Sequence, residues 1–280
     1  MNKKLLIIGL GLIGGSYALK LKEKGYEIYG IDKNQEVLDY ALKNKIIRKG
    51  ILTPDKSFIS QFDYVILALY PKTLLEFVNK YHNYFKKDCI ISDVSGIKEY
   101  FIYKVQELLP QCEFIGAHPM AGRETLGIYN AKSDLFVKAN YIITPTNKNT
   151  ARGINFAKQI GEDLDVYKIS MLSPQEHDMM IAYLSQLTHT IAISLMTCKD
   201  TTNLASYSGD SFTDLTRIAK IDENMWTELF ILNKDKLVKE MDIFIQDFIK
   251  LKECIAQGDE NKIKELMKLS SLRREYFIKK

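Results

Sequence analysis

The sequence has few residues of the kinds that mark special protein classes. Of its 280 residues only 15 are glycine and 6 are proline, too few for a disordered, collagen-like or loop-dominated chain. Lysine and arginine total 39 and aspartate and glutamate 35, so the net charge of +4 indicates no strongly basic surface. We therefore expect a globular protein whose partner is neither nucleic acid nor a membrane, whereas a small anionic ligand is compatible with this charge.

The cysteines and the apolar segments exclude further classes. The four cysteines are far apart and form no C-x-x-C pair, so neither a metal site nor a redox dithiol is indicated: Cys89, Cys112, Cys198 and Cys254. No apolar run approaches the roughly 18 residues that a membrane helix needs. Glycines interrupt the apolar start of the chain and no A-x-A-type cleavage site follows, so a signal peptide is not expected. A cytoplasmic protein is the best reading.

The length favours two domains, and the first 170 residues alternate short apolar runs with helical patterns. This alternation is typical of a parallel sheet with helices on both faces. We predict an α/β fold with a doubly wound domain over residues 1–170. Its expected strands are Leu5–Ile8, Glu27–Ile31, Tyr64–Leu69, Cys89–Asp93, Glu113–Gly116, Tyr141–Thr144 and Asp165–Ile169.

The strand signal stops after Ile169, and an all-helical domain is predicted over residues 171–280. Ser173, Pro174 and Glu176 form an N-cap, a first-turn proline and a capping-box acid. Helices are expected over residues 174–198, 211–220 and 223–257, and from residue 259 onward. In the longest of these, apolar residues alternate four and three apart, as in a heptad seam: Leu237, Met241, Phe244, Phe248, Leu251 and Ile255. The seam packs either within the domain or against a second subunit.

A G-x-G-x-x-G motif directly follows the first predicted strand and opens a helix. Its glycines permit a tight turn and close approach of a pyrophosphate to the helix N-terminus, as in Rossmann-type dinucleotide-binding domains. The next strand ends at an aspartate that favours NAD over NADP, because a carboxylate repels a 2′-phosphate. The alternative is a glycine-rich turn without a nucleotide. The candidate cofactor residues are Gly9, Gly11, Leu12, Ile13, Gly14 and Asp32.

Two loops follow the fourth and fifth predicted strands, over residues 92–98 and 116–124. The carboxyl ends of parallel strands face the ligand crevice, so both loops should border the nicotinamide. His118 would lie near the transferred hydride and, as a neutral imidazole, accept a hydroxyl proton. The alternative is a purely structural histidine.

The predicted helical domain carries two polar groupings. Asp178, Ser185 and His189 share one helix face, which is either a solvated surface or a set of substrate ligands. Asp214 and Arg217 are one turn apart, and they form either a simple ion pair or an arginine clamp for a substrate carboxylate that Asp214 orients. The single tryptophan is expected in the core rather than in the site.

Taken together, these segments resemble the prephenate dehydrogenase family, the oxidoreductases of tyrosine biosynthesis, over essentially the whole chain. The motifs that carry the resemblance are GLGLIGGS, DVSGIK, GAHPMAGRE, EHDMMIAYLSQLTH, and DLTRIA followed by MW. The resemblance implies oxidation of the C4 hydroxyl of prephenate by NAD⁺ with loss of the ring carboxylate as CO₂. It implies an enzyme that yields 4-hydroxyphenylpyruvate and NADH and needs no metal. The heptad-type seam favours a homodimer formed through the helical domain.

The resemblance also assigns roles to individual residues. It places the catalytic base at His118 and the carboxylate-binding arginine at Arg217, with Asp214 as its partner. The other positions that it assigns to the site are Ser95, which contacts the histidine, cofactor or substrate, and the substrate-side residues His189, Ser185, Glu124 and Gln186. Ser95–Gly96 reverses the order usual in the family, Arg123 replaces a small polar residue, and Gln186 stands where a histidine is frequent.

Three other functions stay open. Arogenate dehydrogenase has the same chemistry with an amino group in the substrate side chain. A non-catalytic dinucleotide-binding regulator would have no need of His118 in the crevice. A different two-domain dehydrogenase would explain the nucleotide motif but not the combination of His118 with Asp214 and Arg217.

Overall fold

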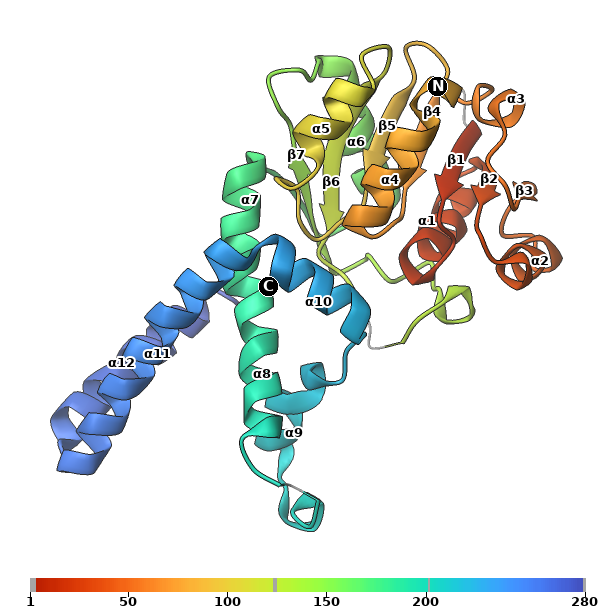
Figure 1. The fold of residues 1–280 in the computed structure, drawn as a ribbon. Helices are drawn as coiled ribbons and strands as arrows, with labels where there is room; N and C mark the ends of the chain where they lie inside the picture. The colour runs from red at the N-terminus through yellow and green to blue at the C-terminus, as the bar shows by residue number, and fades with distance from the viewer. Residues whose placement is uncertain (1–3, 123–124, 201, 279–280) are drawn as a thin grey trace. The chain divides into compact units, whose positions relative to one another are not determined.

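The computed structural model describes residues 4–122, 125–200 and 202–278. The chain divides into two compact units, Met1–Asn233 and Lys234–Lys280. The first unit contains the sheet, the flanking helices and the first part of the helical region (Figure 1). The second is a pair of helices. The predicted domain boundary at residue 170 stays a prediction.

An eight-stranded sheet of the described residues forms the centre of the first unit, in the order β3-β2-β1-β4-β5-β6-β7-β8. All neighbouring strands are parallel except β6 and β7. The strands are β1 (Lys4–Ile8), β2 (Glu27–Ile31), β3 (Lys49–Ile51), β4 (Tyr64–Leu67), β5 (Ile90–Asp93), β6 (Glu113–Pro119), β7 (Asn140–Thr144) and β8 (Lys168–Met171).

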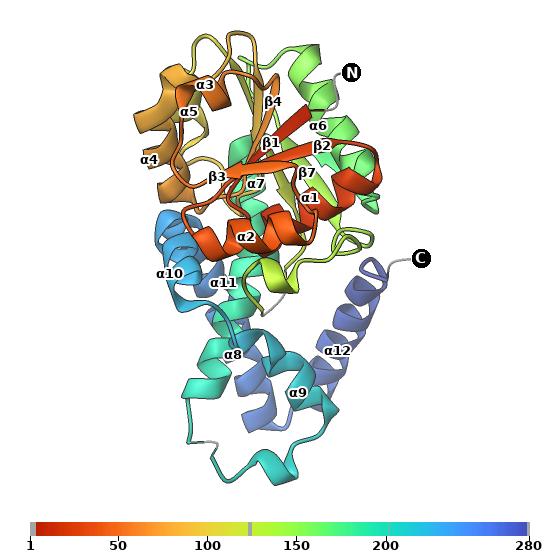
Figure 2. The ribbon, with the colours of Figure 1, turned by 90° about the vertical axis from the view of Figure 1, so that its right-hand side faces the viewer.

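Helices cover both faces of this sheet, which confirms the predicted doubly wound architecture (Figure 2). One face packs against α1 (Leu12–Glu23), α2 (Gln35–Lys43) and α6 (Ala151–Asp163). The other packs against α3 (Lys56–Ile59), α4 (Pro71–Tyr81) and α5 (Ile102–Leu108). Successive strand side chains alternate between the two cores: Leu5 and Ile7 face the first, and Leu6 and Ile8 the second.

The sheet differs from the prediction at several strand ends and in its topology. The short strand β3 was not expected. The last strand begins at Lys168, because Asp165 adopts a left-handed conformation (φ 54°) in the preceding turn and pairs with Lys20 and Lys24 on α1. Strand β7 is antiparallel to β6, because the described part of their connection has only a short 3₁₀ helix, Ile128–Asn130, and no crossover helix.

Helices dominate the chain after the sheet. They are α7 (Pro174–Ile181), a π-helical segment (Ala182–Leu187), α8 (Thr188–Thr197), α9 (Asp210–Thr216), a 3₁₀ turn (Arg217–Ala219), α10 (Glu223–Leu232), α11 (Lys234–Gln257) and α12 (Glu260–Glu275). The predicted capping box is confirmed, because the Ser173 hydroxyl accepts from the Glu176 amide and the Glu176 carboxylate accepts from the Ser173 amide. The π-helical turn was not predicted.

The expected helix over residues 223–257 is wrong as a single element, because it breaks at Asn233. This residue is buried and non-helical (φ −118°, ψ 20°). Its side-chain amide donates to the Asp178 carbonyl (2.9 Å) and to Gln186 Oε1 (2.8 Å). These two bonds are made to the helix that starts at Pro174, and they end α10 where the apolar pattern alone would continue it.

The continuous helix Pro174–Thr197 is long and apolar enough, by length and composition alone, to cross a membrane. No such segment was expected from the sequence. Core helices of soluble proteins meet the same criterion, and this helix contributes residues to the pocket described below.

The glycines of the β1–α1 turn allow a direct test of close packing. A Cβ at Gly14 would lie 1.9 Å from the Gly9 carbonyl oxygen, whereas one at Gly11 would meet nothing within 4 Å. Gly14→Ala should therefore lower the free energy of unfolding by roughly 1 to 3 kcal/mol, as overpacked sites do. Urea titration of both variants measures this. A loss in Gly11→Ala equal to that in Gly14→Ala would contradict it.

Candidate active site

A cavity of about 600 Å³ opens at the carboxyl ends of β1, β4, β5 and β6, where ligands bind in open α/β sheets. All of its lining belongs to the first unit. The sheet side comprises the glycine loop, the β4–α4 and β5–α5 turns and the end of β6. The helical side comprises the π-helical segment, the start of α8, the turn after α9, and α10. The predicted site residues among the lining are Gly11, Leu12, Ile13, Gly14, Ser95, His118, Ser185, Gln186, His189 and Arg217.

The glycine loop has the geometry that a dinucleotide requires. Gly9 adopts φ 90°, and a Cβ there would lie 2.4 Å from the Ala68 carbonyl oxygen, so only glycine fits this turn. Gly11 is the N-cap of α1, has no side-chain cap and borders open space. A pyrophosphate can therefore approach the amide groups at the positive end of the helix. The residues fit an NAD pyrophosphate at this point.

Asp32 lies at the end of β2, as predicted, and organises the same loop. Its carboxylate accepts hydrogen bonds from the Leu10 amide (2.7 Å) and from the Asn34 amide (2.9 Å). The side chain stays partly exposed next to the glycine turn. It does not belong to the lining of the cavity, so its contact with the adenosine ribose remains a prediction.

His118 is held by a chain of hydrogen bonds that the sequence analysis missed. Its Nδ1 lies 2.9 Å from Nε2 of His177, and Nδ1 of His177 lies 2.7 Å from the Asp178 carboxylate. The Asp178 carboxylate also accepts from the backbone amides of Lys98 and Glu99, at 2.8 Å each. Asp178 is therefore buried behind the site and not in the predicted row of substrate ligands with Ser185 and His189.

These hydrogen bonds determine the tautomer of His118. A carboxylate only accepts, so His177 carries its proton on Nδ1 and presents Nε2 as an acceptor. The Nδ1 of His118 must then be the donor between the two rings. Nε2 of His118 is left as the basic nitrogen, which is the form that a general base requires.

The surroundings also keep this imidazole neutral. Burial, the neighbouring His177 ring and the Lys98 ammonium, in that order, hold the pKa of His118 well below its usual range. Burial likewise lowers the pKa of His177, with the Lys98 charge as a further cause. Both rings are therefore uncharged at neutral pH, and His118 is ready to accept a proton.

A buried ion pair between Lys98 and Asp93 fixes the two loops around His118. Lys98 Nζ lies 2.5 Å from the Asp93 carboxylate and also donates to the carbonyls of Ser95 (2.9 Å) and Ala117 (2.7 Å). The Asp93 carboxylate in turn accepts from the amides of Ser95 and Ala117. The bonded backbone groups belong to Ser95 itself and to Ala117, which directly precedes His118. The Lys98–Asp93 pair therefore determines where Ser95 and His118 lie.

The helical wall presents both polar and aromatic groups. The Nδ1 of His189 donates to the Ser185 carbonyl (2.8 Å), and its ring stacks on Trp226 with centroids 3.7 Å apart. Trp226 lines the cavity, so its predicted core position is wrong. Gln186 also lines the cavity but is buried, and its amide donates to the Leu229 carbonyl and accepts from Asn233.

The remaining predicted residues divide into three cases. Arg217 lines the cavity from the turn after α9. Asp214 is exposed on α9 and is not part of the lining. Glu124 lies outside the described residues. Among the described residues, no group of three or more His, Cys, Asp or Glu side chains could hold a metal ion.

Comparison with known proteins identifies the family. A model of the nucleotide-binding domain of prephenate dehydrogenase matches residues 17–169, and one of its dimerization domain matches residues 173–269. The prephenate dehydrogenase of Bacillus subtilis (strain 168) is 32% identical over 271 residues, which cover 92% of this chain and 72% of the relative. The cyclohexadienyl dehydrogenase of Zymomonas mobilis is 30% identical over 284 residues, covering 97% and 95%.

A solved structure gives the same result. The prephenate dehydrogenase from A. aeolicus, crystallised with hydroxyphenyl propionate and NAD⁺, matches with a TM-score of 0.89 and 30% identity, covering 98% of each chain. The family models and these relatives confirm the resemblance seen in the motifs. The chain belongs to the prephenate dehydrogenase family, and it is an NAD-dependent dehydrogenase.

Proposed function

We propose that this enzyme converts prephenate to 4-hydroxyphenylpyruvate and CO₂ and reduces NAD⁺ to NADH. The observation that carries the proposal is the position of His118, whose basic Nε2 belongs to a cavity that also contains the glycine loop and Arg217. One cavity thus holds a proton acceptor, a nucleotide loop and a guanidinium for a carboxylate. The relatives named above act on substrates of this class.

The roles of the residues follow from their chemistry. His118 accepts the proton of the ring C4 hydroxyl, and His177 and Asp178 keep its Nδ1 proton in place. Arg217 binds a substrate carboxylate, and Ser185 and His189 offer further polar groups on the same helical side of the cavity. When bound, NAD⁺ supplies the acceptor for the C4 hydride. Loss of the ring carboxylate makes the ring aromatic, so the protein needs chiefly to align the reactants.

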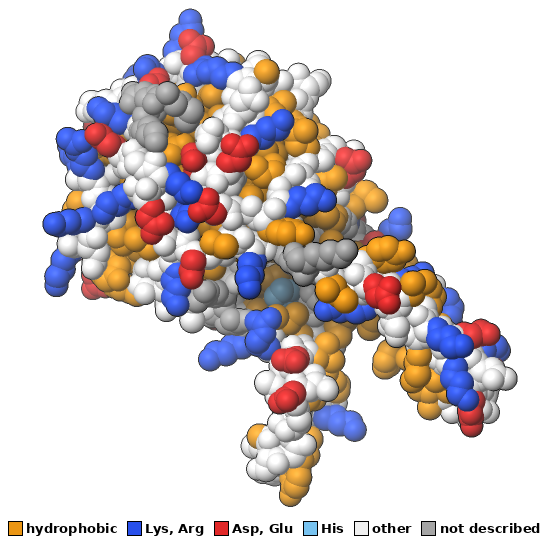
Figure 3. All heavy atoms as spheres, turned by 180° about the vertical axis from the view of Figure 1, so that it is seen from behind, with side chains coloured by type: hydrophobic (Ala, Val, Ile, Leu, Met, Phe, Trp, Pro, Cys, Tyr) orange, Lys and Arg blue, Asp and Glu red, His pale blue; other side chains and the backbone are white. Residues whose placement is uncertain are grey.

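We further infer a homodimer that works in the cytoplasm. The helical region matches a family model described as a dimerization domain. Its helices expose many large apolar side chains, some of which are visible in Figure 3. Phe244, Phe248 and Ile255 of the predicted seam are exposed by 37%, 62% and 61% in the single chain, so packing within it does not cover them. A second subunit is the natural cover for such a stripe.

A matrix of substrates and cofactors tests the proposed reaction. NADH formation should be fastest with prephenate and NAD⁺, and slower with arogenate or with NADP⁺, because Asp32 disfavours a 2′-phosphate. Initial rates under identical conditions measure this. Preference for arogenate would replace the proposed substrate. Nucleotide binding without turnover of either substrate would instead indicate a regulator that has lost catalysis.

Replacement of the proposed base should mainly affect the chemical step. His118→Asn is expected to lower kcat by roughly 10² to 10⁴, with much less effect on KM, because proton transfer is lost and binding is not. In the unchanged enzyme, kcat/KM should fall with acid only below pH 6.5, since burial depresses the pKa of His118. His82→Asn, at a half-buried site outside the cavity, is the matched control. Near-normal kcat in His118→Asn would refute the assignment.

Replacement of the proposed clamp should mainly affect binding. Arg217→Ala is expected to weaken substrate affinity by about 2 to 4 kcal/mol, because a bound carboxylate loses its charged partner. Steady-state KM for the substrate, with NAD⁺ saturating, measures the loss. Lys220→Ala removes an exposed positive charge three residues away, outside the cavity lining, and should leave KM unchanged. Equal KM values in Arg217→Ala and the parent would remove Arg217 from the site.

A further inference from the structure

Two cysteines that are distant in the sequence are neighbours in the sheet. In the parallel pairing of β5 and β6, Ile90 lies opposite Glu113, and the Glu113 amide donates to the Cys89 carbonyl (2.9 Å). Cys89 and Cys112 immediately precede this pair, so they occupy the next position of the same register. The sequence spacing of the cysteines, without a C-x-x-C motif, did not indicate that these two lie side by side.

Their side chains lie on the same face of the sheet. Cys89 belongs to the apolar core under α3, α4 and α5, and Cys112 packs against that core from its edge. The two thiols influence each other's pKa, and the Cys112 thiol donates to the Lys86 carbonyl (3.4 Å). Neighbouring strands are about 4.7 to 4.9 Å apart, within the Cα separations of about 4.4 to 6.8 Å found in disulfides. A bond between the two sulfurs therefore needs little backbone movement.

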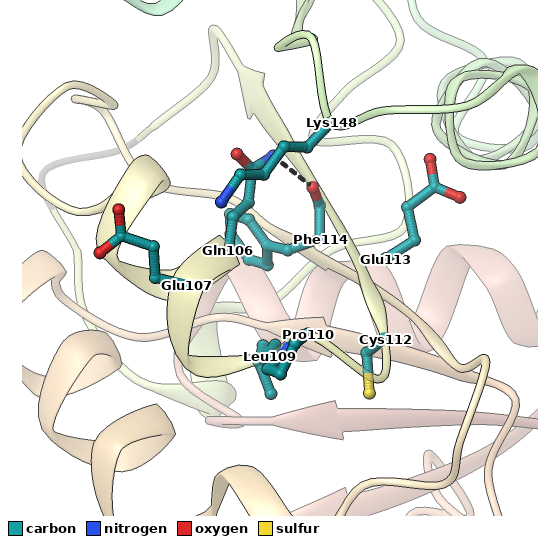
Figure 4. A pocket seen from close by; sticks show the side chains of 8 residues that line it. All are labelled: Gln106, Glu107, Leu109, Pro110, Cys112, Glu113, Phe114 and Lys148. Atoms are coloured by element: carbon teal, nitrogen blue, oxygen red, sulfur yellow. Dashed lines mark hydrogen bonds between the residues drawn. The ribbon is translucent and has the colours of Figure 1, made fainter.

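The two thiols differ in accessibility and acidity. Cys89 is fully buried, whereas Cys112 is half-buried and lines a cavity of about 420 Å³ at the amino ends of the strands. Figure 4 shows Cys112 at the edge of this cavity, with Lys148 on another side. Interaction with the Cys89 thiol lowers the pKa of Cys112, and interaction with Cys112 together with burial raises the pKa of Cys89. Cys112 is thus the thiol that reacts first, and Cys89 is the one that resolves.

We propose that Cys89 and Cys112 form a reversible dithiol–disulfide pair that small disulfides such as oxidised glutathione oxidise. The Cys112 thiolate attacks one sulfur of the small disulfide, breaks its S–S bond and expels one thiolate. The Cys89 sulfur then attacks the Cys112 sulfur and expels the second thiolate, which takes up the Cys89 proton. In sum, two protein thiols are oxidised to one disulfide and one small disulfide is reduced to two thiols.

The location of the cross-link determines its effect. It would close the segment 89–112, which contains Ser95 and Lys98, at the edge of the sheet opposite the active-site cavity. Closing a loop of this length restricts the unfolded chain, so the folded enzyme gains thermal stability. The carboxyl ends of β5 and β6 are not altered, so kcat/KM should be the same in the oxidised and reduced forms.

The test uses a background in which the other two cysteines are replaced, Cys198→Ser with Cys254→Ser. After incubation with oxidised glutathione, digestion without reductant should yield one peptide pair joined through Cys89 and Cys112, and the intact mass should fall by two hydrogens. Tm should rise by roughly 5 to 10 °C and return after reduction with dithiothreitol.

The matched control is Cys112→Ser in the same background, which keeps Cys89 and the core intact. It should show neither the linked peptides nor the rise in Tm. The proposal would be overturned by a stable glutathione adduct on Cys112 without linkage to Cys89, or by fully reduced thiols at both positions after exposure to the oxidant. A rise in Tm that persists in the control variant would also contradict it. Because both thiols lie outside the catalytic cavity, loss of the proposed dehydrogenase reaction would leave this test unaffected.

Discussion

The hydrogen-bond chain from Asp178 through His177 to His118 is the interaction on which the site depends. It joins the first turns of the helical region to the end of a sheet strand. Its His177 and Asp178 side chains are buried behind the cavity. A buried carboxylate without partners would be strongly unfavourable. Here the amides at Lys98 and Glu99 and the His177 ring satisfy it, so the helix can dock in one arrangement. That arrangement leaves one nitrogen of His118 basic, on a residue that lines the cavity.

The Lys98–Asp93 pair supports the same histidine from the sheet side. Burial raises the pKa of Asp93 and lowers that of Lys98, and each charge opposes the change in the other. The pair persists because its remaining hydrogen bonds are satisfied by the backbone at Ser95 and Ala117. A charged group next to His118 also disfavours the imidazolium. One buried pair therefore both positions the loops and favours the neutral form of the His118 imidazole.

The helical wall completes the site through a local irregularity. The π-helical turn over Ala182–Leu187 lies where the wall meets the cavity, and such turns are common at functional sites. Gln186 is tied to α10 from this turn, and Asn233 is tied both to Gln186 and to the Asp178 carbonyl. The bonds that shape this side of the cavity thus connect α10 with α7, the helix that contains His177 and Asp178. On the same side of the cavity, the ring of Trp226 stacks on that of His189.

The sequence by itself determined the features that depend on neighbours along the chain. These are the strand, glycine turn and helix at Gly9–Gly14, the capping box at Ser173, and the place of His118 at a strand end, because spacing and local conformation dictate each of them. The roles of His177 and Trp226, the break at Asn233 and the adjacency of Cys89 with Cys112 were decided only by tertiary structure. Each depends on a partner that is close in space and far along the chain, and neither periodicity nor motif spacing carries that information.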